Sequence, residues 1–364
     1  MHKQQNNITE IQEPFEAGVI HSADYLEITD FEHLYASMQK CRCSVLWKDS
    51  VASFYINGVE RTLTLERELN NGTYRARTPK AFKIYSPKER DIVSISFRDR
   101  VYQRSLNDNY IYPVMTASFI HDNWACQKGK GTDGARNRLK EFMHSYYRKY
   151  GADGYVLKID IKGYYPNMSH RVVEQMFRAK LEPSVYSLTE KILREQYKGD
   201  MGYNPGSQLI QIAGIALLDK VDHYIKERLG VKYYLRYMDD FVLIHESKEY
   251  LEYCLCEIKK KLREVECAIS PKKTYITTLK GGIMFLGFTY RLTDSGKVLA
   301  HIDPKNVKRE RKKLAHAVAK AKRGELTREK VDEMYTAWKA HASKGNSYKL
   351  IQRMDEYYRN LWRS

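Results

Sequence analysis

The stretch YLRYMDDFVLI, residues 234–244, places two adjacent aspartates between two runs of strand-forming residues. Aromatic and β-branched residues on both sides favour strands, so Asp239 and Asp240 are predicted at the tip of a hairpin. Two adjacent carboxylates repel each other. We therefore expect either a positively charged partner or an exposed, hydrated turn at this point.

The composition predicts a globular and strongly basic protein. The chain has 364 residues, of which 43% are apolar, so it can bury a substantial core and is expected to fold as two or three subdomains. Lys and Arg number 62 against 45 Asp and Glu, which gives a net charge of +17. Such an excess indicates a polyanionic partner, with nucleic acid as the leading candidate. A merely basic surface is the alternative.

The N-terminus and the cysteines bear on the cellular compartment. The first residues, MHKQQNNITEIQEPFEAG, contain no apolar segment of signal-peptide length, and no run in the chain reaches the length of a membrane span. We therefore expect a cytoplasmic protein with no membrane partner. Six cysteines occur without a C-x-x-C pair, so reduced thiols are expected rather than a zinc site.

Four regions follow one another along the chain. Residues 1–76 hold a polar leader and a helix-like stretch without recognisable chemistry. In residues 77–108, basic residues accompany a pattern typical of two strands and a helix. Residues 151–298 mix strands and helices around the acidic hairpin, and the C-terminal segment reads as basic amphipathic helices interrupted near Gly324 and Gly345. These last helices could line a nucleic-acid groove or simply present a solvated basic face.

A third carboxylate comes at the end of another predicted strand. In GYVLKIDIKGYYPNMSH, residues 154–170, alternating apolar residues lead to Asp160 just before a glycine and a polar turn. If this strand lies beside the 233–244 hairpin, Asp160 converges with Asp239 and Asp240. Such oxygen ligands suit Mg²⁺, and two ions of this kind can activate a primer hydroxyl and stabilise leaving pyrophosphate. Otherwise, Asp160 caps a turn and the other two decorate a surface hairpin.

These motifs resemble those of reverse transcriptases, in the same order over residues 77–290. YMDD is similar to the palm hairpin of that family. The resemblance implies that Tyr237 and Met238 lie beneath the primer end. It also implies that Asp239 and Asp240 are catalytic carboxylates at the metal site.

DIKGYY, which begins at Asp160, resembles the first palm motif of the family. The resemblance implies that Asp160 contacts both metal ions and that the main-chain carbonyl of Ile161 helps to bind them. Tyr165 falls at the aromatic steric gate of the family, where a ring leaves no room for a ribose 2′-hydroxyl. Deoxynucleotides would therefore be preferred. Plain core packing is the other interpretation of Tyr165.

An upstream block resembles the fingers motif that grips the triphosphate. It reads YSPKERDIVSISFRDRVYQRSL. Lys88 and Arg90 are the first candidates for phosphate contact in nucleotide binding. Arg98 and Arg100 are second candidates, because a guanidinium can bind phosphate oxygens with two nitrogens.

Other blocks resemble the parts that hold the template, the leaving group and the primer. In SFIHDNWACQKGKGTDGA, Gly129 and Gly131 match glycines that let the backbone approach the template. In AISPKKT, Lys273 matches, better than Lys272, the lysine proposed to protonate the leaving pyrophosphate. Either lysine could instead be a solvated residue at a strand edge. GGIMFLGF resembles the primer-grip hairpin. The core residues of that hairpin would be Phe285, Leu286 and Gly287.

One motif departs from the commonest pattern of the family. Most reverse transcriptases have Gln-Gly-x-x-x-Ser-Pro beside the incoming nucleotide. This chain reads NPGSQLIQIAG, which keeps Gly206 but has Pro205 for the Gln, with Ile210 and Gln211 for the Ser and Pro. The final Gln is similar to enzymes of diversity-generating retroelements. Pro205 offers no amide side chain to a nucleotide, so we expect relaxed base selection, which a misincorporation spectrum would test.

The resemblance implies a right-hand polymerase of the α+β class. Residues 1–76 would be an N-terminal extension and residues 77–150 the fingers. Residues 151–298 would be the palm, an antiparallel sheet backed by helices together with part of the fingers, and residues 299–364 a basic helical thumb. Two Mg²⁺ ions would be the cofactor, with Mn²⁺ as a substitute. The partners would be an RNA template, a DNA or RNA primer and deoxynucleoside triphosphates. A structured non-coding RNA and a small accessory protein are further candidates.

Three kinds of bacterial reverse transcriptase are similar to this compact chain: those of diversity-generating retroelements, of retrons and of phage defence. Gln211 favours the first. An RNA-dependent RNA polymerase should lack the ring of Tyr165, and a noncatalytic nucleic-acid-binding protein needs none of Asp160, Asp239 and Asp240. A template-independent or protein-primed DNA polymerase would keep every motif, and the sequence leaves that alternative open.

Overall fold

The computed structural model describes residues 22–85, 89–204 and 206–363. The chain divides into two compact units. One comprises the residues up to Tyr112 with Leu181–Gln196, and the other comprises Pro113–Lys180 with the residues from Tyr197 onward. The acidic hairpin and the strand that ends at Asp160 belong to the second unit. The boundaries given above for fingers, palm and thumb stay predictions.

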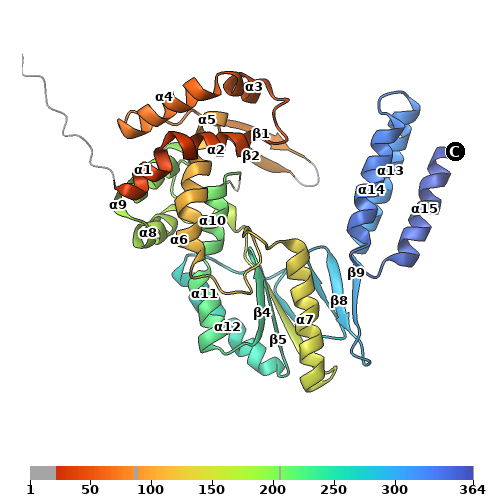
Figure 1. The fold of residues 1–364 in the computed structure, drawn as a ribbon. Helices are drawn as coiled ribbons and strands as arrows, with labels where there is room; N and C mark the ends of the chain where they lie inside the picture. The colour runs from red at the N-terminus through yellow and green to blue at the C-terminus, as the bar shows by residue number, and fades with distance from the viewer. Residues whose placement is uncertain (1–21, 86–88, 205, 364) are drawn as a thin grey trace, which may run out of the picture. The chain divides into compact units, whose positions relative to one another are not determined.

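The first unit is a set of helices with one hairpin (Figure 1). Three of its helices begin at side-chain caps, because the side chains of Ser22, Asp30 and Ser96 accept hydrogen bonds from main-chain amides. β1 and β2 pair antiparallel and α5 follows them, which confirms the two strands and a helix predicted for residues 77–108. The elements are α1 (Ala23–Thr29), α2 (Phe31–Arg42), α3 (Asp49–Ile56), α4 (Gly58–Asn70), β1 (Lys80–Ile84), β2 (Arg90–Ser94), α5 (Phe97–Leu106), a π-helical turn (Asn107–Ile111) and α9 (Pro183–Gln196).

The second unit is built on an antiparallel sheet in the order β4-β5-β3-β6. β3 is the strand predicted from GYVLKID, and β4 and β5 form the predicted acidic hairpin. The elements up to β6 are α6 (Tyr112–Thr116), which begins at the unit boundary, α7 (Thr132–Tyr150), β3 (Tyr155–Asp160), a 3₁₀ turn (Tyr165–Asn167), α8 (His170–Lys180), α10 (Gln208–Ala216), α11 (Asp219–His223), a π-helical turn (Tyr224–Arg228), β4 (Tyr233–Tyr237), β5 (Asp240–His245), α12 (Lys248–Glu264) and β6 (Tyr275–Thr278).

Both faces of this sheet are covered by helices (Figure 1). Val156 and Val242 belong to one hydrophobic cluster with Leu139 of α7. The alternate residues Leu157 and Leu243, also fully buried, point to the other face, and α12 packs on β3 and β5. Burial on both faces explains why these strands are apolar apart from Lys158 and Arg236 and the residues at their ends.

A smaller sheet and three helices complete the unit. β7 (Ile283–Phe285), β8 (Phe288–Leu292) and β9 (Val298–Ile302) pair antiparallel. α13 (Pro304–Lys322), α14 (Arg328–Ala342) and α15 (Tyr348–Arg363) follow, with Gly324 and Gly345 between them, as predicted. α13 contacts both α14 and α15 (Figure 1). No helix in the described parts of the chain combines the length and the apolar character needed to cross a membrane.

Candidate active site

The three predicted carboxylates meet at one end of the β4-β5-β3 sheet. Asp160 ends β3 and stands opposite Asp240, the first residue of β5, in the antiparallel register. Asp239 lies in the turn between β4 and β5, and its carbonyl accepts a hydrogen bond of 3.3 Å from the amide of Ile161. This confirms that β3 lies beside the acidic hairpin, which was the condition for the predicted convergence of the three carboxylates.

The turn itself holds a non-glycine residue in an unfavourable conformation. Tyr237 pairs with Asp240, so Met238 and Asp239 form a two-residue hairpin turn. Met238 has a φ of 54°, a left-handed conformation that costs a residue with a side chain about 1–2 kcal/mol. The guanidinium of Arg236 donates a hydrogen bond of 2.9 Å to the Met238 carbonyl, and this contact helps to hold the turn.

Arg236 anchors the hairpin to the helices behind it. Its side chain is fully buried and forms a bidentate ion pair with Asp222, with nitrogen–oxygen distances of 2.7 and 2.5 Å. It also donates to the carbonyl of Ile215 at 2.9 Å, and the hydroxyl of Tyr234 donates to Asp222. One guanidinium thus joins α10, α11 and the turn that carries Asp239.

Two lysines supply the positive charge that the adjacent acids require. Lys158 Nζ lies 3.0 Å from Asp240 Oδ2 and donates at 2.6 Å to the main-chain carbonyl of Met284 in β7. Lys273 Nζ lies 3.0 Å from each carboxylate oxygen of Asp160. Lys158 is buried in β3, whereas Lys273 is exposed. Lys158 therefore links a candidate catalytic carboxylate to the β7–β8 hairpin.

Burial makes these carboxylates hard to ionise together. The pKa of Asp240 is raised to about 6, chiefly by burial and also by the neighbouring Asp239 and Asp160 carboxylates, although Lys158 opposes the shift. Burial likewise raises the pKa of Asp239. Further positive charge at this end of the sheet would therefore favour the ionised form of both carboxylates.

The donor atoms suit a hard divalent cation. The candidate ligands are the carboxylates of Asp160, Asp239 and Asp240 and the carbonyl of Ile161, all of them oxygens, and Asp240 Oδ1 is buried without a hydrogen-bond partner. Mg²⁺ and Mn²⁺ favour such ligands. Within the described residues, no group of three His, Cys, Asp or Glu side chains is arranged so that it could hold a metal ion while the lysine contacts are in place. The residues fit a cation that replaces the lysine contacts, and their role as metal ligands stays a prediction.

Tyr165 lies between the acidic turn and α10. Its hydroxyl is 3.8 Å from the sulfur of Met238, and a side-chain carbon built on Gly214 would come within 2.8 Å of that hydroxyl. The neighbouring Tyr164 hydroxyl donates to the Gly214 carbonyl. Gly214 thus leaves space for the Tyr165 ring beside the turn, while the role of that ring as a steric gate stays a prediction.

The predicted triphosphate contacts lie partly outside the described residues. Lys88 is not described, and of Arg90 only the main chain is placed, in β2. Arg98 forms an ion pair with Glu68 within the first unit. The nucleotide-binding roles of Lys88 and Arg90 stay predictions.

The nucleotide motif that departs from the family pattern leads into α10. Pro205 lies outside the described residues, and Gly206 is exposed just before Ser207, whose side chain caps the helix. Gln211 lies in the first turns of α10, with its side-chain oxygen 3.8 Å from the sulfur of Cys126. Roles of these residues in nucleotide binding stay predictions.

The predicted primer-grip residues form the β7–β8 hairpin. Phe285 is fully buried and pairs with Phe288, so Leu286 and Gly287 form the turn, with φ values of 45° and 88°. Arg136 of α7 donates two hydrogen bonds, of 2.6 and 3.2 Å, to the Leu286 carbonyl. The β4–β5 and β7–β8 hairpins therefore each contain a residue in the left-handed backbone conformation. In both hairpins an arginine donates a hydrogen bond to the carbonyl of that residue.

Comparison with known proteins identifies the family. The family described as reverse transcriptase (RNA-dependent DNA polymerase) matches residues 82–290, more than half of the chain. The chain belongs to the reverse transcriptase family. Its fold is therefore that of a right-hand polymerase with mixed helices and antiparallel sheets, as predicted, and the description of the family names the predicted enzyme class, RNA-directed DNA polymerase. Reverse transcriptase domains use divalent metal ions, and the family matched here copies RNA.

Among solved structures, this reverse transcriptase is similar to two telomerases. The apo telomerase of Candida tropicalis, truncated from its C-terminal domain, is 14% identical over 61% of this chain and 55% of its own, with a TM-score of 0.46. The telomerase of Candida albicans in complex with a telomeric RNA fragment is 14% identical over 66% of this chain and 50% of its own, with a TM-score of 0.47. The chain thus spans about half the length of these structures. No curated protein shows significant similarity to it.

Three buried cations of this reverse transcriptase were given no role from the sequence. Lys158, Arg236 and Arg136 each bind a main-chain carbonyl of one of the two hairpins. For Lys158 and Arg236 a signal was present, since each is a lone charge inside an otherwise apolar strand. A buried charge requires a partner, so both residues could have been marked as partners of the nearby acids.

Proposed function

We propose that this chain extends a primer by copying RNA into DNA. The observation that supports the proposal best is the register that places Asp160 opposite Asp240, with Asp239 in the adjoining turn. Convergent carboxylates at strand ends suit phosphoryl transfer, in which the protein mainly positions reactants and balances charge. Membership of the reverse transcriptase family supplies the reaction class.

Different residues of the chain would bind the metal ions and protonate the leaving group. Asp160, Asp239, Asp240 and the Ile161 carbonyl would hold two Mg²⁺ ions or Mn²⁺. When bound, such ions neutralise charge on the attacking and leaving oxygens. Lys273 would exchange its contact with Asp160 for the leaving pyrophosphate and donate a proton to it.

Other residues would select the nucleotide and hold the primer. Tyr165 would exclude the ribose 2′-hydroxyl, and Gly206 and Gln211 would border the incoming nucleotide. Lys88 and Arg90 would bind its triphosphate. The primer end would lie on the two hairpins through the following residues: Tyr237, Met238, Phe285, Leu286 and Gly287.

Primer extension tests the proposal directly. The assay supplies an RNA template, a DNA primer, Mg²⁺ and all four deoxynucleotides to the wild type, to Asp239→Asn and to Asp49→Asn, which removes an exposed carboxylate of α3. We expect template-length product from the wild type and Asp49→Asn, and a loss of about 10²–10³-fold in Asp239→Asn with an unchanged melting temperature. Equal product from Asp239→Asn would contradict the assigned site.

We further propose that the enzyme serves a bacterial diversity-generating retroelement. Gln211 and the substitution at Pro205 support this assignment and predict low fidelity. A structured non-coding RNA and a small basic accessory protein would be its partners, in the cytoplasm. The alternative is a retron or phage-defence enzyme with template-independent or protein-primed synthesis. Sequencing the product distinguishes them, because untemplated or protein-linked DNA would refute the first assignment.

A further inference from the structure

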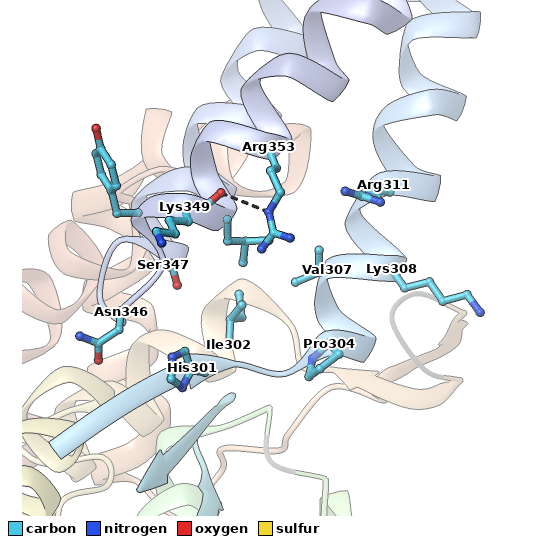
Figure 2. Close-up of a pocket in the computed structure, with 13 residues that line it drawn as sticks. His301, Ile302, Pro304, Val307, Lys308, Arg311, Asn346, Ser347, Lys349 and Arg353 are labelled. Carbon is cyan, nitrogen blue, oxygen red and sulfur yellow. Dashed lines mark hydrogen bonds between the residues drawn. The ribbon is translucent and has the colours of Figure 1, made fainter. Parts of the chain in front are cut away.

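A groove of about 950 Å³ lies between α13 and α15, beside the end of β9 (Figure 2). Its apolar part consists of Ile302, Pro304, Val307 and Leu350. This volume is at the upper end of the range of ligand sites, about 300–1,000 Å³. None of its lining residues belongs to the predicted polymerase site.

The charges around the groove are all of one sign. Arg311 and Lys308 come from α13, Lys349 and Arg353 come from α15, and no carboxylate lines the groove. In the described part of the chain, no Asp or Glu pairs with any of these four cations. Figure 2 shows Arg311 and Arg353 on the two helices that border the groove, with both side chains extending into the space between the helices. Like charges at short range repel each other. An anion bound in the groove would reduce this repulsion.

Both arginines are held so that their terminal nitrogens remain available. Arg311 Nε lies 3.4 Å from the sulfur of Met354, and its guanidinium carbon lies 5.2 Å from the centre of the Tyr357 ring. Arg353 Nε donates to the Lys349 carbonyl at 3.3 Å (Figure 2). Among the described residues, no hydrogen bond or ion pair involves the Nη atoms of either arginine, so these atoms can bind phosphate oxygens with two hydrogen bonds.

The shape and the aromatic content of the groove distinguish between nucleic acids. A duplex receives a helix into its own groove, whereas this site is a hollow bordered by two helices. Positively charged grooves with aromatic side chains are typical of single-strand binding, because bases stack on the rings. Tyr348 lines this groove and is 75% exposed. We propose that the α13–α15 groove binds single-stranded RNA, in addition to the primer–template at the polymerase site.

An acidic peptide would also match the charge of the groove. RNA is favoured because two arginine forks match successive phosphates and because Tyr348 offers a stacking surface that a carboxylate does not need. Membership of a family that copies RNA also favours RNA over an acidic peptide as the ligand of the groove. The proposal goes beyond polymerisation and does not require it.

The test compares two pairs of charge removals on the same helices. Arg311→Gln with Arg353→Gln removes the groove arginines. Lys322→Gln with Arg359→Gln removes two exposed cations of α13 and α15 that do not line the groove. Fluorescence anisotropy of a labelled short oligouridylate, and of an RNA–DNA primer–template duplex, gives the dissociation constants over a range of salt concentrations. Thermal melting verifies that both double variants are folded.

We expect the groove variant to bind oligouridylate about tenfold or more weakly than the wild type. The slope of the logarithm of the binding constant against the logarithm of the salt concentration should fall in magnitude by about 1.4, as the loss of two phosphate contacts predicts. Duplex binding should change less than about twofold, and the control variant should change both affinities little. Oligouridylate carrying 5-iodouridine should crosslink to Tyr348. Because no metal or nucleotide is needed, the full Asp239→Asn protein should bind oligouridylate as the wild type does, even if it makes no DNA.

Three results would overturn the proposal. Equal weakening by the groove and control variants would mean that only net charge matters. Equal weakening for duplex and single strand would make the groove part of the primer–template path. Displacement of oligouridylate from the groove by polyglutamate at matched charge concentration would instead indicate an acidic protein partner.

Discussion

Replacing Arg236 with methionine tests whether the buried ion pair holds the acidic turn. Methionine preserves much of the side-chain volume. Among the described residues it leaves Asp222 with the Tyr234 hydroxyl as its one side-chain donor, and it removes the donor to the carbonyls of Ile215 and Met238. Removing one partner of a buried ion pair costs about 3–5 kcal/mol of unfolding free energy. For a domain of this size, we therefore expect the melting temperature to fall by about 6–20 °C.

Urea unfolding followed by far-UV circular dichroism gives the free energies for a double-mutant cycle. Arg236→Met combined with Asp222→Asn removes both charges, so it should recover about 1–3 kcal/mol relative to the sum of the single changes. Arg359→Met, at an exposed site, should stay within about 0.5 kcal/mol of the wild type. If Arg236→Met costs less than about 1 kcal/mol, or if the two changes simply add, the reasoning about this ion pair is refuted.

Three further perturbations probe the site and its support. Lys158→Met should lower kcat/KM for primer extension by about 10–100-fold, because a buried charged contact is lost, and an unchanged rate would contradict its linking role. Tyr165→Val should increase the use of ribonucleotides relative to deoxynucleotides by about 10–100-fold, so an unchanged ratio of kcat/KM values would exclude a gate. Burial opposes ionisation of Asp122, but Arg138 and Lys226 outweigh it and lower its pKa. Its contribution to stability is therefore present above the unfolded-state pKa and lost as the pH falls through the lower folded-state pKa. Asp122→Asn should destabilise the protein near neutral pH and flatten the acid limb of its stability profile, and an identical pH profile would refute this.

The acidic hairpin was predictable because its signals are local. Aromatic and β-branched residues on either side of Asp239 and Asp240 specify two strands, although the turn was predicted one residue too late: Met238 and Asp239 form it, and Asp240 already belongs to β5. The strand that ends at Asp160 was also predicted from local residues. Its place beside β5 was not predicted, because the metal-site hypothesis only assumed it. The structure confirms that assumption through the pairing of Asp160 with Asp240.

The supporting cations could not be assigned in the same way. Lys158 contacts Asp240, 82 residues away in sequence, and Met284, 126 residues away. Arg136 reaches the Leu286 carbonyl across 150 residues. No local pattern encodes such pairs, because they depend on how strands and helices far apart in the chain come together.

The sequence by itself determined the strands, the amphipathic helices, the acidic turn and the family, since each depends on residue type and spacing over short distances. Only the tertiary structure decided which lysine neutralises which carboxylate, which arginine holds each left-handed turn, and where Arg311 and Arg353 line the same groove. The physical reason is that the cost of a buried or unpaired charge depends on the groups that surround it, and folding brings those groups from distant parts of the chain.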